Sequence, residues 1–177
     1  MSPWTETSFL HEVGHAVALG LQGKDSVIRR MADGTRGCNC PEPEGVDEVI
    51  VAMGSALAVT AYRLTTNADS ATLMLSLEPE QILSMARHAM MTEHDYAGDL
   101  KQFGPDHSGT FTDVQAAAAR LIWRFGVRAK ADPVLDTWVA ERVEQLNADP
   151  ASAVVMPVSA SMKLLGIDYY HAAEAAH

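Results

Sequence analysis

The chain has 177 residues, 47% of them apolar and 20% charged, which is typical of one globular domain rather than of a disordered chain. Its net charge is −10, with 13 Lys and Arg against 23 Asp and Glu. Phosphate binding needs a basic face, and the sequence offers no basic cluster beyond the pair Arg29–Arg30, so we expect no nucleic-acid partner.

No stretch reaches the ~20 continuous apolar residues that cross a bilayer, so we expect no membrane association. The run MSPWTETS lacks the basic and apolar regions of a signal peptide. Cys38 and Cys40 are separated by one residue, too few for an unstrained disulfide, and are expected to be free thiols. These features predict a cytoplasmic protein with a single domain over residues 1–177.

A first helix is predicted from a cap at Ser2 and from Pro3 in the first turn, and it ends at Gly20 or Gly23. Apolar residues recur along it at helical spacing, so one of its faces is expected to be buried. Residues 26–45 combine a short β-like run, an Asp-Gly turn and a second arm, which predicts a small hairpin or edge strand.

A strongly apolar helix is predicted from Asp47 to Leu64 as the centre of the core, and its small residues 54–56 would let another helix approach closely. A polar break covers residues 65–70, and the tail from Asn147 is expected to be helical only in part. Capping and proline signals mark the starts of further helices at Pro79, Thr92, Thr112 and Pro133. The predicted fold class is mainly α, or α+β, with a small hairpin after the first helix.

The first helix carries the motif HEVGH, in which His11 and His15 are four residues apart and share one face. Two imidazoles at that spacing can bind one zinc ion, at about 2.0–2.1 Å each. Zinc lowers the pKa of a water molecule, and Glu12, beside the first ligand, can accept its proton during attack on a carbonyl. The motif therefore predicts His11 and His15 as ligands of Zn²⁺ and Glu12 as general base.

Gly14, inside this motif, costs about 0.5–1 kcal/mol relative to Ala in the middle of a helix. That cost is understandable where a neighbouring backbone passes close to the metal-bearing face.

A catalytic zinc site needs a third protein ligand. Spacing alone does not choose among the acidic and histidine residues that follow the second apolar helix: His88, His94, Asp95, Asp99, His107 and Asp113.

The run TSFLHEVGHAVALGL resembles the active-site helix of the peptidase domain of FtsH-type ATP-dependent zinc proteases, which typically shows HEAGHA. Residues 26–43 resemble the family's strand and turn beside the substrate cleft, and residues 47–64 resemble its following helix. The resemblance covers residues 5–125 and leaves 126–177 as a C-terminal helical extension. It implies a zincin-like helical metallopeptidase domain with Zn²⁺ as cofactor.

The family's third zinc ligand is an aspartate at the start of a later helix, in a pattern like GAENDLKQA. The segment MTEHDYAGDLKQF offers both Asp95, three residues after Thr92, and Asp99, which copies the letters DLKQ. The resemblance favours Asp95 as the ligand, with Asp99 behind it orienting a histidine. Asp99 and Asp113 remain as alternatives.

The chain has no Walker-type GxxxxGK[ST] motif, so the resemblance implies a peptidase that does not use ATP. Its substrates would be peptides or flexible protein segments, laid along the edge strand near Val27 to Met31. One alternative is a catalytically silent, zinc-stabilised binding or regulatory module, against which the intact Glu12 argues. Another is an acidic helical adaptor for which the metal is incidental.

Overall fold

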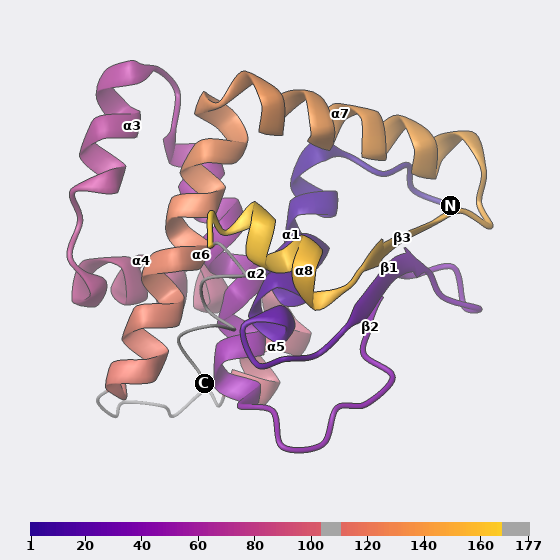
Figure 1. The fold of residues 1–177 in the computed structure, drawn as a ribbon, viewed down its shortest axis with the longest axis horizontal. Helices are drawn as coiled ribbons and strands as arrows, with labels where there is room; N and C mark the ends of the chain where they lie inside the picture. Colours follow the sequence, from indigo (N-terminus) through magenta and orange to yellow (C-terminus); the bar gives the residue numbers. More distant parts are fainter. Residues whose placement is uncertain (104–110, 168–177) are drawn as a thin grey trace.

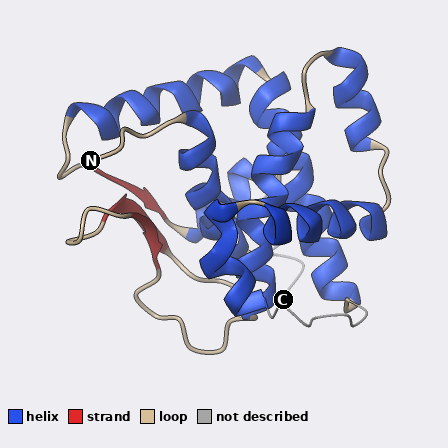
Figure 2. Ribbon diagram, turned by 180° about the vertical axis from the view of Figure 1, so that it is seen from behind, coloured by secondary structure: helices blue, strands red, loops and turns tan. Residues whose placement is uncertain are grey.

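A computed structural model of the chain describes residues 1–103 and 111–167. Within these residues the fold is mainly helical, with a small sheet at one side of the helices (Figures 1 and 2). The elements are α1 (Glu6–Gly20), β1 (Ser26–Arg30), β2 (Arg36–Asn39), α2 (Glu48–Leu64), α3 (Ala68–Leu75), α4 (Pro79–Thr92), the 3₁₀ turn η1 (His94–Tyr96), α5 (Ala97–Phe103), α6 (Asp113–Ala131), α7 (Pro133–Ala148), β3 (Ala153–Met156) and α8 (Val158–Leu164).

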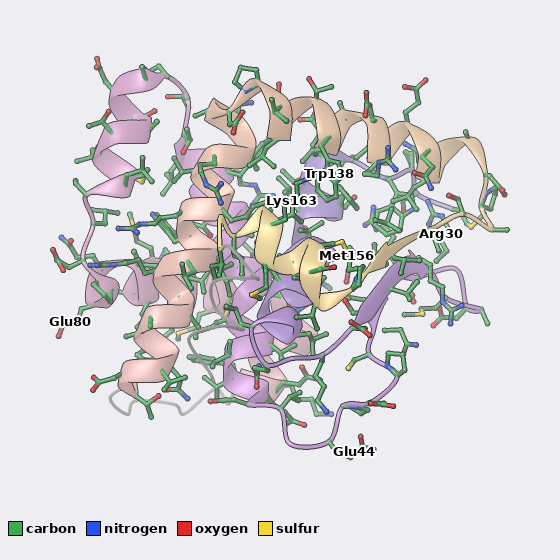
Figure 3. The ribbon with its side chains drawn as sticks, in the orientation of Figure 1. Arg30, Glu44, Glu80, Trp138, Met156 and Lys163 are labelled. Carbon is green, nitrogen blue, oxygen red and sulfur yellow. The ribbon has the colours of Figure 1, made fainter. Side chains whose placement is uncertain are left out.

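Helix α2 is the centre of the core, as its apolar sequence predicts, and it contacts α1, α4, α5 and α6. Trp123 of α6 is fully buried, and its indole N–H donates to the carbonyl of Met74 at the end of α3. Helix α1 packs on α2, and away from α2 it contacts α7, whose Trp138 (labelled in Figure 3) packs against Phe9 of α1 with ring centroids 5.4 Å apart. Helices therefore cover α1 on both sides and hold it in place.

The helix starts predicted at Pro79, Thr112 and Pro133 are confirmed, whereas the start predicted at Thr92 was wrong, because Thr92 is the last residue of α4. Thr112 and Gln115 exchange hydrogen bonds at the start of α6, and Pro79 occupies the first turn of α4. The first helix begins at Glu6 instead of Pro3, because Thr5 forms a reciprocal capping box with Ser8. A helix that was not predicted, α3, begins inside the predicted polar break and continues beyond it to Leu75, and its cap Asn67 pairs with Ser70.

The three strands form an antiparallel sheet in the order β2-β1-β3. Val27 of β1 lies opposite Asn39 of β2 on one side and Val155 of β3 on the other. The segment near Val27 to Met31 is therefore a central strand, and the prediction that it is an edge strand was wrong. Strand β3 comes from the weakly patterned tail, and no local pattern there predicts a second partner for β1.

Of the predicted C-terminal extension, residues 126–167 lie in the part that the structure describes, and they pack into the rest of the domain. The predicted start of this extension lies inside α6, β3 completes the sheet, and α8 packs on α1. No helix in the described ranges is both long and apolar enough to cross a membrane.

Candidate metal centre

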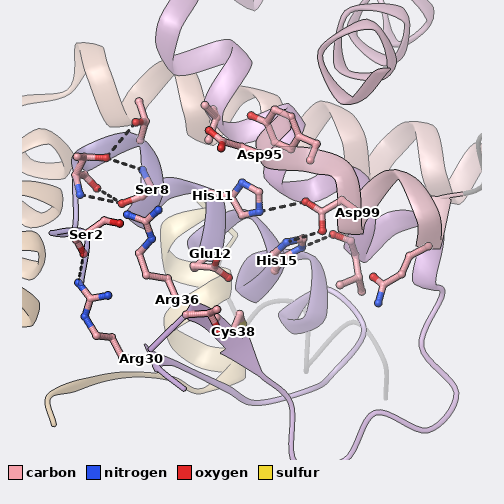
Figure 4. A pocket seen from close by; sticks show the side chains of 18 of the residues that line it. Ser2, Ser8, His11, Glu12, His15, Arg30, Arg36, Cys38, Asp95 and Asp99 are labelled. Atoms are coloured by element: carbon pink, nitrogen blue, oxygen red, sulfur yellow. Dashed lines mark hydrogen bonds and ion pairs between the residues drawn. The ribbon is translucent and has the colours of Figure 1, made fainter. Parts of the chain in front are cut away.

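Helix α1 and helix α5 bring two histidines and one carboxylate together (Figure 4). His11 Nε2 lies 3.1 Å from Asp99 Oδ2, and His15 Nε2 lies 3.2 Å from Asp99 Oδ1. The two imidazoles lie one helical turn apart on the same face of α1, as the HEVGH spacing predicts, and their ring centroids are 5.1 Å apart. Of the described residues, these three form a group able to hold a metal ion, with donor atoms all within 4.8 Å of one another.

The donor set and its spacing fit zinc. Two ligands bound at 2.0–2.1 Å in a tetrahedron are about 3.3–3.4 Å apart. The observed separations of 3.1 and 3.2 Å between the histidine nitrogens and the Asp99 oxygens are close to that edge length. Two imidazoles and one carboxylate also match the ligand set of catalytic zinc sites, which keep a fourth position open.

The second nitrogen of His15 is held by helix α2. His15 Nδ1 lies 2.8 Å from the carbonyl oxygen of Val51, and since a carbonyl can only accept, Nδ1 must carry a hydrogen. Nε2 is thereby the nitrogen left to bind a metal. A backbone carbonyl on the outer nitrogen is a common way to orient a metal-binding histidine. His11 is oriented differently, by stacking on the ring of Tyr96 at 5.2 Å and 14°.

Asp99 is held by a buried hydroxyl on α2. Ser55 is fully buried, and its Oγ donates to Asp99 Oδ2 at 2.8 Å. Val51 and Ser55 can reach the site because α2 touches the motif itself. A Cβ placed on Gly14 would lie 2.4 Å from the carbonyl oxygen of Gly54, which confirms the predicted close passage of a backbone at this glycine.

Charge within the group also couples these residues. Burial opposes the charged form of His15, but its hydrogen bond to Asp99 and the negative charges of Asp99 and Glu12 outweigh burial and raise the pKa of His15 to about 9. Burial alone would raise the pKa of Asp99, yet the hydrogen bonds from His11 and His15 hold it well below its ordinary value. In the metal-free protein the site is therefore an ion pair between a carboxylate and an imidazolium.

The structure places Asp99, and not the preferred Asp95, beside the two histidines. Asp95 is exposed on the 3₁₀ turn η1, at the border of the same cleft. Because η1 precedes α5, helix α5 begins at Ala97, and Asp99 falls in its first turn facing α1. The other candidates do not join the group: His88, His94 and Asp113 are exposed, and His107 lies outside the described residues.

His11, His15 and Asp99, called the metal group from here on, open into a cleft of about 1180 Å³ between α1, β2 and the turn before α5. Glu12 lines this cleft with 9% of its surface exposed, and its carboxylate forms no hydrogen bond with another described residue. In Figure 4 it lies next to His11, on the side of the strand that carries Cys38. An acceptor without a donor, in contact with the cleft, is free to take a proton from a molecule bound there.

Cys38 and Cys40 also line the cleft, as free thiols. Burial raises the pKa of Cys38 to about 12, so its thiol stays protonated at neutral pH. Neither cysteine belongs to the group of possible metal ligands among the described residues.

Four residues that were not predicted contribute to the site: Val51, Ser55 and Tyr96 contact the three possible ligands, and Arg36 lines the cleft. Ser55 had a visible signal, since it belongs to the run of small residues in α2, but that run suggested packing alone. The contacts of the other three depend on how helices and strands distant in sequence meet, which local patterns do not encode. In comparisons with known proteins, no family model, curated protein or solved structure matches this chain.

Proposed function

We propose that this protein is a zinc-dependent metallopeptidase of zincin-like fold, related to the FtsH-type peptidase domain and independent of ATP. The observation that carries the proposal is the meeting of HEVGH with a carboxylate from another helix: Asp99 lies within 3.2 Å of both histidines. Glu12, on the same helix, borders the cleft without a hydrogen-bond donor from any described residue. Each residue type that this reaction needs is therefore present in one place.

The proposed roles follow from these contacts. His11, His15 and Asp99 would hold the ion, with Asp99 replacing Asp95 in that role. Bound zinc supplies a Lewis acid that polarises a carbonyl and lowers the pKa of a water molecule. Glu12 accepts the proton lost in the attack and can pass it to the leaving amine.

The substrate would be a peptide or a flexible protein segment, because the cleft is open and its wall includes a strand. β1 is paired on both sides, so the substrate strand moves from Val27–Met31 to the outer edge of β2, whose residues Arg36 to Cys38 line the cleft. An extended peptide can add to such an edge through backbone hydrogen bonds.

The proposal is tested by zinc content and peptide hydrolysis in four proteins: wild type, the double variant His11→Ala/His15→Ala, Glu12→Gln, and Glu42→Gln as a control. Glu42 is an exposed loop carboxylate that does not line the cleft, so its variant should match wild type. We expect one zinc per wild-type chain, none in the double variant, and full zinc without hydrolysis in Glu12→Gln.

Absence of zinc from the wild type would contradict the proposal. Zinc in the wild type, but no hydrolysis of a broad set of peptides, would favour the zinc-stabilised binding module instead.

A further inference from the structure

Two arginines face each other directly at one end of the cleft. In the register of β1 and β2, Arg30 lies opposite Arg36, so both side chains project from the same face of the sheet. Both guanidinium groups also lie over the ring of Trp4, at 5.7 Å and 6.0 Å from its centroid. Like charges directly opposite in an antiparallel pair destabilise the pairing. This arrangement therefore opposes folding unless something compensates the charge.

No described carboxylate provides that compensation. Arg30 donates to the carbonyl oxygens of Ser2 and Gly34, and Arg36 donates to that of Pro3 at 3.1 Å. These acceptors are neutral, and neither arginine forms an ion pair with another described residue. The sequence has 23 acidic residues, so the absence of an ion-pair partner for either guanidinium among the described residues does not reflect a shortage of carboxylates.

The turn between the two strands contains an acidic residue that is already engaged. Asp33 accepts hydrogen bonds from the backbone N–H and the hydroxyl of Thr35, at 2.9 and 2.6 Å. It lies outside ion-pair distance of both arginines. Each guanidinium has five N–H donors in a planar fork, so donors remain on both Arg30 and Arg36.

These donors belong to the same cleft as the metal group. Arg30, Arg36, Glu12 and His11 all line it. In Figure 4 the guanidinium of Arg36 reaches toward Ser8, one helical turn before Glu12. Both arginines are half-buried, and the charge of a partly desolvated guanidinium is screened less than one in open water. The cleft therefore has a carboxylate-rich metal end and a cationic end.

We propose that Arg30 and Arg36 form a carboxylate-binding subsite, so that the preferred ligand of the cleft is a peptide with an acidic group at this end. A carboxylate would accept hydrogen bonds from the free N–H donors and remove the repulsion between the two arginines. The group comes from an acidic side chain or from a C-terminal carboxylate. The inference rests on the proposed function in assuming that the ligand is a peptide.

Three peptides of one sequence separate these sources: one with Gln and an amidated C-terminus, one with Glu in place of that Gln, and one with Gln and a free C-terminal carboxylate. Their affinities are measured calorimetrically on zinc-supplemented Glu12→Gln protein, so that no peptide is cleaved. The same measurement is made with Arg30→Gln and Arg36→Gln added. The control is Arg29→Gln, because Arg29 changes the net charge equally but is exposed, does not line the cleft, and alternates to the other face of β1.

We expect one or both acidic peptides to bind about tenfold more tightly than the neutral peptide, as a charge-assisted hydrogen bond would give. Arg30→Gln and Arg36→Gln should each abolish most of this preference, whereas Arg29→Gln should keep it. If the two arginines only hold the segment around Trp4 in place, their loss would lower the affinity for all three peptides alike. The ratio of the affinities for the acidic and neutral peptides would then stay unchanged.

Equal affinity for the three peptides, no binding of any of them, or the same loss in Arg29→Gln would overturn the inference. These results are distinct from failure of the proposed function, which is read from zinc content and from hydrolysis by the unsubstituted chain.

Discussion

The backbones of Gly14 and Gly54 are in direct contact, one within the HEVGH motif and the other in the middle of α2. A Cβ on Gly54 would lie 2.5 Å from the carbonyl oxygen of Gly14, and one on Gly14 would lie 2.7 Å from the Cα of Ser55. This contact lets α2 deliver the carbonyl of Val51 to His15 and the hydroxyl of Ser55 to Asp99. The positions of His15 and Asp99 therefore depend on how closely α1 and α2 pack.

Gly14→Ala should destabilise the protein, although Ala is the better helix former. The new Cβ would meet backbone atoms, which cannot rotate away, and overpacking of this kind costs about 1–3 kcal/mol. Gly98→Ala in α5 is the matched control, since a Cβ there meets nothing within 4 Å. The control should gain up to about 1 kcal/mol from helix propensity. Urea denaturation of the metal-free proteins measures the free energy of unfolding of both variants. A higher free energy of unfolding for Gly14→Ala than for wild type would contradict the packing argument.

Sequence reasoning succeeded where local chemistry decides. The helix starts predicted near Asp47, at Thr112 and at Pro133 depend on contacts within one turn, and the histidines of HEVGH share a face because helical geometry alone places them there. The need for a close backbone at Gly14 was visible for the same reason.

The features that could not be predicted are those in which a side chain or strand meets a partner that is distant in the sequence. The choice between Asp95 and Asp99 depends on a 3₁₀ turn that shifts the start of α5, and this turn has no strong sequence signal. Strand β3 has four residues, too few for a periodic pattern, and its pairing with β1 leaves β2, which lines the cleft, as an edge strand.

Asp99→Asn should lower zinc affinity much more than Asp95→Asn does. Asp99 contacts both histidines, whereas Asp95 is exposed and outside the ligand group. Loss of a ligand should exceed the roughly 10–100-fold loss seen when only a group behind a ligand is removed, while Asp95→Asn should stay within about twofold. Zinc competition with a chromophoric chelator reports the affinity, and the zinc-dependent rise in Tm should disappear in Asp99→Asn. The reverse pattern would restore Asp95 as the ligand.

Ser55→Ala should weaken zinc binding without removing a ligand. The variant deletes the hydroxyl that donates to Asp99 Oδ2 at 2.8 Å and introduces no new atom. Without this donor the carboxylate is less well oriented, and we expect zinc affinity to fall about 10–100-fold. Substituting cobalt for zinc adds a spectroscopic measurement, since its visible absorption reports the coordination geometry.

Ser161→Ala is the control for this variant. Ser161 is equally buried, and its hydroxyl donates to the backbone carbonyl of Ala16, but it does not line the cleft. Both variants should lose comparable metal-free stability, whereas only Ser55→Ala should change zinc affinity and the cobalt spectrum. Equal zinc affinity in the two variants would show that the Ser55 hydroxyl does not position Asp99.

Zinc affinity should rise with pH. In the metal-free protein, burial opposes protonation of His15, but Asp99 and Glu12 outweigh it and raise the pKa to about 9. His15 therefore carries a proton on Nε2 at neutral pH, and that proton must leave before the nitrogen can bind a metal. Below this pKa, each pH unit should change the apparent zinc affinity about tenfold through His15 alone.

The metal-free stability should follow the opposite trend. Folding raises the pKa of His15 from 6.5 to about 9, so protonated His15 stabilises the folded state. This stabilisation is complete at pH values below 6.5 and is lost as the pH rises through about 9. Chelator competition from about pH 6.5 to 8 and thermal unfolding of the metal-free protein from about pH 7 to 10 measure the two trends. If zinc affinity did not change over that range, His15 would have to be neutral in the metal-free protein. The ion pair with Asp99 would then make no contribution to either trend.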